Sequence, residues 1–68
     1  MSLVVTGRLS KILTEKDIKQ KELALMTGLT EPTISRFDKQ TRYDIETLFR
    51  ISRALNSAIE DLFEVIEI

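Results

Sequence analysis

Three basic side chains, Arg36, Lys39 and Arg42, recur at every third position, and Asp38 is the one acid among them. The planar guanidinium of arginine can make two parallel hydrogen bonds to a phosphate or to O6 and N7 of guanine, and lysine adds a point charge. These groups bind anions and do not break bonds. The cluster therefore predicts a site for an anionic partner, although such charges can also simply solvate a surface.

Bond-breaking chemistry lacks its usual residues. The sequence has no histidine and no cysteine, so its serine hydroxyls have no evident base. The same absence removes the usual zinc ligands and any disulfide framework. We therefore predict that the protein is not an enzyme and that it holds neither a metal nor a cofactor.

The 68 residues, 43% of them hydrophobic, allow a single domain over 1–68 with one small core. A chain of this size buries only about 60% of its unfolded surface, so we expect it to gain stability from a second copy. No apolar run approaches the roughly 20 residues that span a bilayer, and Leu3–Val5 lacks the basic start of a signal peptide. We expect a cytoplasmic protein that does not contact membranes.

The formal charge of −1 argues against nucleic acid, because phosphate neutralisation dominates such affinity. The charge is unevenly distributed, however. Residues 58–68 hold four acids and no base, which leaves +3 for the rest of the chain. A basic region and an acidic end thus remain compatible with a nucleic-acid partner.

The basic residues depend for their position on two short helices, expected over 20–27 and 31–39. Their inner faces would be formed by Leu23, Ala24, Leu29, Ile34 and Phe37. Gly28 is expected to end the first helix with a positive φ, and Thr30 to cap the second. This hinged pair, the core of the domain at 20–39, is suited to offering its second helix to a DNA groove.

Helical spacing also predicts a helix over 8–16, one that follows a cap at Asp44 and ends near Asn56, and a short fifth helix from Ser57 or Ala58 to about Phe63. Met26 is expected to fill the core. Both chain ends are rich in β-branched residues. A strand at 3–6 could pair with one at 64–67, within a subunit or between two, or both ends could fray.

The sequence resembles the phage-repressor and Cro-like helix-turn-helix proteins, also called the xenobiotic-response-element family. The resemblance lies in QKELA at 20–24, TGLT at 27–30 and TISRF at 33–37, and then in 45–48, Ile51, 54–55 and 59–63. It implies an all-α fold, a five-helix bundle of the lambda-repressor type, and the terminal strands match a subset of small members whose chain ends pair. It also implies a sequence-specific transcriptional regulator, most simply a repressor that binds a palindromic operator as a homodimer. The small size of the chain suits a phage or prophage regulator.

In such proteins the second helix of the hinge enters the major groove and the first braces against the backbone. The resemblance then implies that Glu31, Pro32, Thr33 and Arg36 approach base edges. It places Gln20, Lys21, Lys39, Gln40, Arg42 and Tyr43 on the DNA backbone. Ile34 and Phe37 would point into the core.

Several of these residues have alternative roles. Arg36 could read guanine, or instead contact a phosphate or form a salt bridge with Asp38. Glu31 could accept a bond from cytosine or stabilise its own helix start. Tyr43 could pack on the fourth helix with only its hydroxyl outward. Pro32 stands where a small polar residue is more usual in the family, which removes a polar reader.

A second hypothesis is a protein-interaction module, such as an antirepressor, an antitoxin-like protein or an accessory factor, that keeps the hinge fold and binds a regulatory protein. The negative net charge and the weak readers Glu31 and Pro32 favour it. For a homodimer, the expected contact is the fifth helix together with the apolar tail Val65, Ile66 and Ile68.

Overall fold

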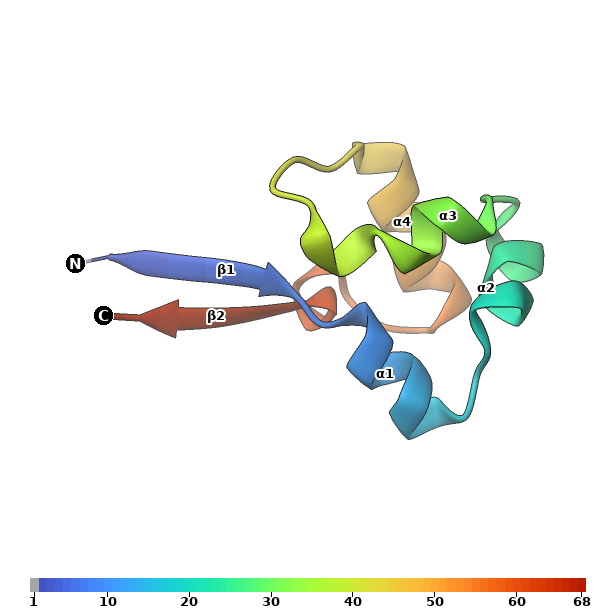
Figure 1. The fold of residues 1–68 in the computed structure, drawn as a ribbon, viewed down its shortest axis with the longest axis horizontal. Helices are drawn as coiled ribbons and strands as arrows, with labels where there is room; N and C mark the ends of the chain where they lie inside the picture. Colours follow the sequence, from blue (N-terminus) through green and yellow to red (C-terminus); the bar gives the residue numbers. More distant parts are fainter. Residues whose placement is uncertain (1) are drawn as a thin grey trace.

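The structure is a computed structural model that describes residues 2–68. Its elements, in chain order, are β1 (Leu3–Gly7), α1 (Leu9–Lys16), α2 (Gln20–Thr27), α3 (Glu31–Ser35), the 3-10 turn η1 (Phe37–Lys39), α4 (Ile45–Ala54), the 3-10 turn η2 (Ile59–Leu62) and β2 (Phe63–Glu67). Figure 1 shows the helices gathered into one body and the two strands projecting from it as an arm. None of the helices in the described part of the chain is both long and apolar enough to cross a membrane.

The predicted all-α, five-helix bundle is wrong, because residues 2–68 contain four α-helices and a two-stranded antiparallel sheet. The predicted fifth helix is the single 3-10 turn η2. Leu62 ends this turn, fully buried, and its carbonyl accepts a hydrogen bond from the Arg8 N–H at 2.9 Å. That bond leads into the β1–β2 ladder, so too few residues remain for the i to i−4 bonds of an α-helix.

The predicted pairing of the chain ends is confirmed, and it lies within one chain. β1 and β2 are antiparallel, with Leu3 opposite Glu67, Val5 opposite Val65 and Gly7 opposite Phe63. At the base of the arm, a Cβ on Gly7 would lie 2.8 Å from a carboxylate oxygen of Asp38 and 2.9 Å from its Cα. Glycine is therefore needed where β1 passes η1.

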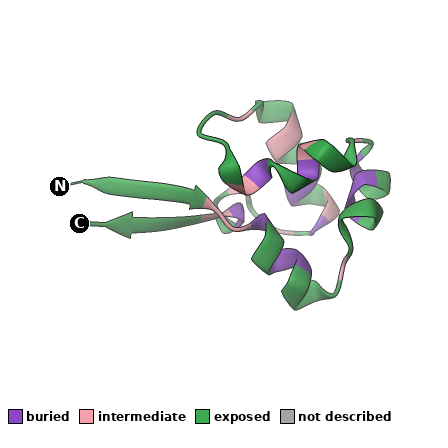
Figure 2. Cartoon of the chain, in the orientation of Figure 1, coloured by how far each residue is buried: buried purple, intermediate pink, exposed green. Residues whose placement is uncertain are grey.

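The core lies between the helices, and neither strand of the arm contributes a buried residue (Figure 2). Its members are Leu9, Ile12, Leu13, Leu23, Ala24, Ile34, Phe37, Ile51, Leu55 and Leu62. The expectation for Met26 is wrong, because its side chain is 53% exposed. The buried stripe of α2 runs through Leu23, Ala24 and Thr27, which turns Met26 toward solvent.

Candidate nucleic-acid interface

The turn between α2 and α3 is closed by the two residues that local patterns predict. Gly28 has a φ of 76°, and its N–H donates to the Ala24 carbonyl at 2.9 Å. Thr30 precedes α3 and its hydroxyl oxygen accepts from the Thr33 N–H at 3.3 Å. The predicted glycine stop and threonine cap are both confirmed. They fix the entry of α3 relative to α2.

Arg50 of α4 also supports this turn, and sequence reasoning missed it. One terminal nitrogen of its guanidinium donates to the Thr27 carbonyl at 2.8 Å, and the other approaches the Glu46 carboxylate at 3.3 Å. Thr27 is the last residue of α2, where carbonyls lack helical partners and the helix dipole favours a cation. The two residues are 23 positions apart, so no local pattern signals the contact.

The predicted helix over 31–39 is split in two. α3 ends at Ser35, Arg36 has backbone angles of −92° and −3°, and η1 then continues with tighter bonds such as Lys39 N–H to Arg36 carbonyl at 3.0 Å. Tertiary contacts account for the break. Phe37 is 1% exposed in the core, and the next residue, Asp38, is bound to α1. Lys39 therefore follows α3 rather than lying on it.

Asp38 caps α1 from outside that helix. Its carboxylate accepts from the Leu9 N–H at 2.7 Å, from the Ser10 N–H at 3.0 Å and from the Ser10 hydroxyl at 2.7 Å. The residue at the N-cap position of α1 is Arg8, whose side chain has no acceptor. Asp38 thus supplies the missing cap, and its charge is committed to backbone N–H groups.

Replacing Asp38 with alanine is expected to lower the free energy of unfolding by about 2 kcal/mol, because it leaves two N–H groups of α1 without an acceptor. Urea unfolding measures the change. Asp44→Ala is the matched control, because Asp44 sits at the N-cap of α4 but, contrary to the predicted cap, its carboxylate accepts no backbone hydrogen bond. Equal unfolding midpoints for the two variants would contradict the capping role.

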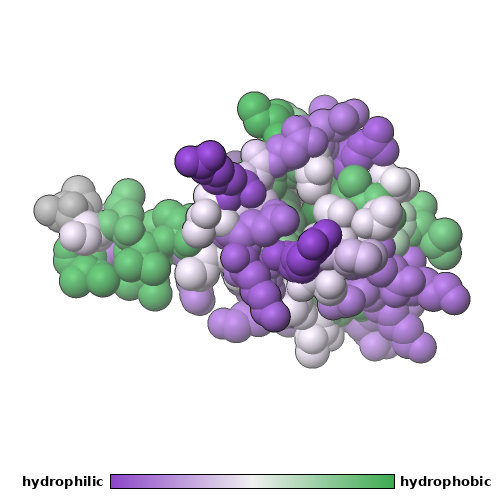
Figure 3. Space-filling model, turned by 45° about the horizontal axis from the view of Figure 1, so that its top comes forward, coloured by the Kyte–Doolittle hydropathy of each residue, from purple (hydrophilic) through white to green (hydrophobic). Residues whose placement is uncertain are grey.

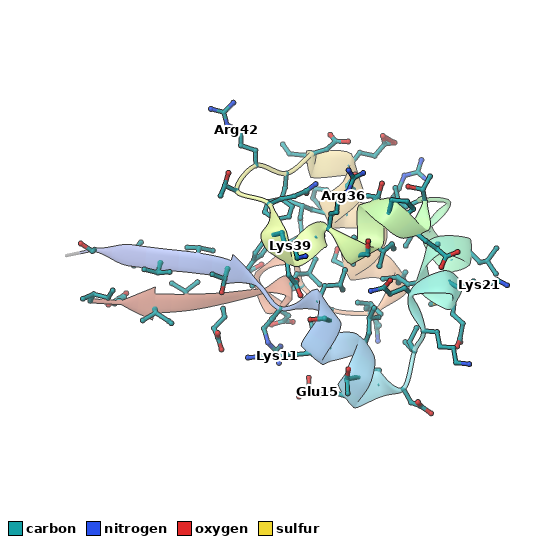
Figure 4. The ribbon with its side chains drawn as sticks, in the orientation of Figure 1. Lys11, Glu15, Lys21, Arg36, Lys39 and Arg42 are labelled. Atoms are coloured by element: carbon teal, nitrogen blue, oxygen red, sulfur yellow. The ribbon has the colours of Figure 1, made fainter. Side chains whose placement is uncertain are left out.

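The basic cluster is left free by this arrangement. Within residues 2–68 the ion pairs are Arg8–Glu15, Lys11–Glu64 and Arg50–Glu46, so none involves Arg36, Lys39 or Arg42. All three are exposed. Figure 4 shows them along α3, η1 and the loop before α4, with Arg42 extending away from the body. The predicted alternative of an Arg36–Asp38 salt bridge is absent from the described part of the chain.

The Arg36 side chain is anchored to the helix that precedes it, α3. Its Nε donates to the Pro32 carbonyl at 3.2 Å, which leaves the two terminal nitrogens without a partner among residues 2–68. A guanidinium held at Nε still offers its terminal N–H groups to a pair of acceptors. Pro32, which lacks an N–H, contributes to the site through this carbonyl.

The remaining predicted base readers lie at the start of α3. Glu31 and Pro32 are exposed in its first turn, and Thr33 is half-buried. The hydroxyls of Thr33 and Thr30 are 2.8 Å apart and hydrogen-bonded to each other. With its hydroxyl engaged in the cap, Thr33 has its methyl group to offer to a thymine.

Gln20 and Lys21 are exposed in the first turn of α2, at the opposite end of the hinge from the basic cluster. No side chain at the Lys19 N-cap bonds this helix start, although the Lys19 N–H donates to the Glu22 carboxylate at 3.4 Å. Unpaired N–H groups at a helix N-terminus attract anions.

Tyr43 packs inward rather than on α4. Its ring centroid lies 4.8 Å from that of Phe37 and 5.1 Å from that of Phe63 on β2. Its hydroxyl donates toward the carbonyls of Phe37 and Gln40, the latter at 3.0 Å. Burial, and then the charge of Asp38, raises the pKa of the Tyr43 hydroxyl. To reach a phosphate, this neutral hydroxyl would have to give up its inward bonds.

Comparison with known proteins agrees with this geometry. The sequence model of the family described as Cro/C1-type HTH DNA-binding domain matches residues 8–67. A solved structure of a candidate DNA-binding protein from Bacteroides fragilis is similar at a TM-score of 0.74 and 27% identity, covering 90% of this chain and 100% of that one. No curated protein matches the sequence.

A second solved structure, the transcriptional regulator VanUg, has a TM-score of 0.72 at 23% identity and covers 100% of this chain and 92% of its own. At that identity the likeness shows the fold. The family match extends from the start of α1 through β2 and includes the whole hinge. The chain therefore belongs to the Cro/C1-type helix-turn-helix DNA-binding domain family.

Proposed function

We propose that the protein is a sequence-specific transcriptional regulator, most simply a repressor, which binds a palindromic operator in double-stranded DNA as a homodimer. One observation carries the proposal. Arg36, Lys39 and Arg42 follow α3 and are exposed and without ion-pair partners within residues 2–68, while the only acid among them is bonded to α1. The surface beside α3 is thus ready to accept phosphates and base edges.

The side chains divide by their place on the hinge. At α3, Arg36 offers its terminal nitrogens to guanine, and Thr33 offers a methyl group to thymine. The other proposed base-facing residues are Glu31 and Pro32. The proposed contacts with the DNA backbone are Gln20, Lys21, Lys39, Gln40 and Arg42. Tyr43, the remaining residue predicted there, is proposed to support the loop at 40–43 through its inward hydrogen bonds instead of contacting DNA directly.

The short length of the helix that is proposed to contact the bases favours a homodimer. α3 has five residues and can contact only a few base pairs. Two copies on half-sites about 34 Å apart double the contacts and explain a palindrome.

The first test is selection of bound duplexes from a random library at moderate salt. We expect an enriched inverted repeat with a guanine in each half-site. Arg36→Ala is expected to lose about 1–3 kcal/mol at that base pair and to relax the preference there. The control is Arg53→Ala, which removes an exposed arginine from the last turn of α4, outside both the hinge and the loop at 40–43.

The second candidate function is a protein-interaction module, which the exposed apolar side chains of the helical body favour. Leu25 is 78% exposed and Ile45 68%. Absence of any enriched sequence for the wild-type protein would support this function and contradict the proposed one. If Arg36→Ala still enriched the same sequence, the proposed base contact of Arg36 would be contradicted, while the proposed DNA-binding function would stand.

A further inference from the structure

The arm carries apolar side chains on both of its faces. Residues directly opposite each other on paired strands point to the same face. One face, the Val65 face, therefore holds Leu3, Val5, Val65 and Glu67, and the other, the Ile66 face, holds Val4, Thr6, Glu64, Ile66 and Ile68. Figure 3 shows the projecting arm as mainly hydrophobic surface.

These side chains are exposed in the isolated chain. Leu3 is 59%, Val5 55% and Val65 57% exposed, so the described chain covers less than half of each. An isolated two-stranded sheet is marginally stable in water, and exposed apolar patches are typical of surfaces that meet a partner. The arm is therefore a candidate interface.

The two faces differ at the base of the arm. The Val65 face continues into a groove of about 260 Å³ lined by Val5, Gln40, Thr41, Tyr43 and Phe63. The floor of the groove is aromatic, with Phe63 and Tyr43 packed at 5.1 Å between ring centroids. The Ile66 face instead ends in Thr6 and Glu64, whose carboxylate lies 3.9 Å from the Lys11 ammonium. Only the Val65 face stays apolar toward the body.

We propose that a second copy of this chain covers the Val65 face, with two arms packed antiparallel about a two-fold axis and the tip of each arm in the groove of the other. This inference rests on the homodimer of the proposed function and locates its interface. A two-fold contact requires one patch that complements itself. The Val65 face meets that requirement, because it has an apolar tip at Leu3 and an apolar-floored groove at its base.

Charge fixes the antiparallel direction. Glu67 lies at the tip of the Val65 face, and the loop beside the groove, residues 39–43, carries Lys39 and Arg42 and no acid. Antiparallel packing brings Glu67 of one copy to this basic loop of the other. Parallel packing would place the two Glu67 carboxylates side by side, which is unfavourable.

The proposal divides the apolar tail that the sequence predicts as the dimer contact. Val65 lies inside the interface, whereas Ile66 and Ile68 lie on the opposite face of the arm. The predicted contribution of the fifth helix also decreases, because η2 buries Leu62 in the core of its own chain.

The test compares two double variants by sedimentation equilibrium over a range of concentrations. Val5→Thr with Val65→Thr makes the Val65 face polar, and Val4→Thr with Ile66→Thr does the same to the Ile66 face. Threonine keeps the β-branched shape that strands favour, so both arms should form. We expect the first pair to raise the Kd of dimerisation roughly a hundredfold, because the interface loses four apolar side chains, two from each subunit. The second pair should change the Kd by less than about threefold.

Glu67→Lys provides an independent check, since residue 67 is exposed and outside the core. It should weaken dimerisation several-fold at low salt and less at high salt. Circular dichroism confirms that each variant is folded. A monomeric wild-type protein at every concentration, equal weakening by both double variants, or a species larger than a dimer would each overturn the proposal.

Binding to a duplex with one half-site separates this inference from the proposed function. A dimer that selects no DNA sequence would contradict the proposed function and leave the interface standing. A monomer that binds the half-site, and binds the full operator without cooperativity, would support DNA recognition and overturn the interface.

Discussion

Raising the salt concentration from about 50 to about 200 mM is expected to weaken binding to the selected operator by about a thousandfold. Each subunit offers Lys21, Lys39 and Arg42 to phosphates, which makes six contacts for a dimer. Every neutralised phosphate releases condensed counterions, and the entropy of that release falls as the salt concentration rises. The size of the effect follows from the number of contacts.

The structure gives the reason for expecting all six contacts to contribute. Within their own chain, Lys39 and Arg42 have no ion-pair partner that DNA would have to displace. In the proposed dimer, Glu67 of the partner subunit is one carboxylate beside these two cations, so the loop keeps a net positive charge toward the phosphates. Asp38, the acid next to Lys39 in the sequence, is held by the Leu9 and Ser10 N–H groups. The Asp38 carboxylate is therefore hydrogen-bonded to α1 and does not neutralise the basic side chains that would meet the phosphates.

Fluorescence anisotropy of a labelled operator at several salt concentrations measures this slope. Lys39→Ala should reduce its magnitude by about 2, because each dimer loses two phosphate contacts. Lys16→Ala is the control, because Lys16 is exposed in the last turn of α1, outside the hinge. Affinity for a partner that does not change with salt would instead indicate an apolar protein interface.

The hinge could be predicted because its signals are local. Gly28 needs a positive φ one residue after α2, and Thr30 caps the N–H three residues ahead. Ile34 and Phe37 follow the helical period into the core, at 3% and 1% exposure. Each of these decisions depends on neighbours within about one turn, which is the range over which sequence patterns act.

The predictions that were wrong concern segments whose structure depends on residues far away in the sequence. Asp38 bonds to α1 across 28 and 29 positions, and this contact helps to convert the end of the expected helix into η1. The predicted fifth helix is a 3-10 turn because the Leu62 carbonyl accepts a hydrogen bond from the N–H of Arg8, which follows β1 and lies 54 positions away in the sequence. The hydrophobic periodicity of the sequence reports on neighbours within one helix or strand, so it signals neither of these long-range contacts. The chain ends were predicted to pair, yet their exposed faces became visible only with the register.

Replacing Phe37 with alanine is expected to lower the free energy of unfolding by about 3–5 kcal/mol. Phe37 is 1% exposed, its ring lies 4.8 Å from that of Tyr43 and 5.6 Å from that of Phe63, and its carbonyl accepts the Tyr43 hydroxyl bond. The cavity that the substitution would leave lies between η1 and the base of the arm, where Phe37 now packs on Phe63. A domain of 68 residues has a total stability of about 3–10 kcal/mol, so a large part of it depends on this ring.

Urea unfolding followed by circular dichroism measures the loss, with Phe49→Ala as the matched control. Phe49 is 46% exposed on α4, so its truncation should cost less, about 1–2 kcal/mol. Because Phe37 connects the segment formed by α3 and η1 to the base of the arm, its truncation should weaken operator binding and dimerisation together. Equal unfolding midpoints for the two variants would mean that the aromatic cluster does not connect these parts of the molecule.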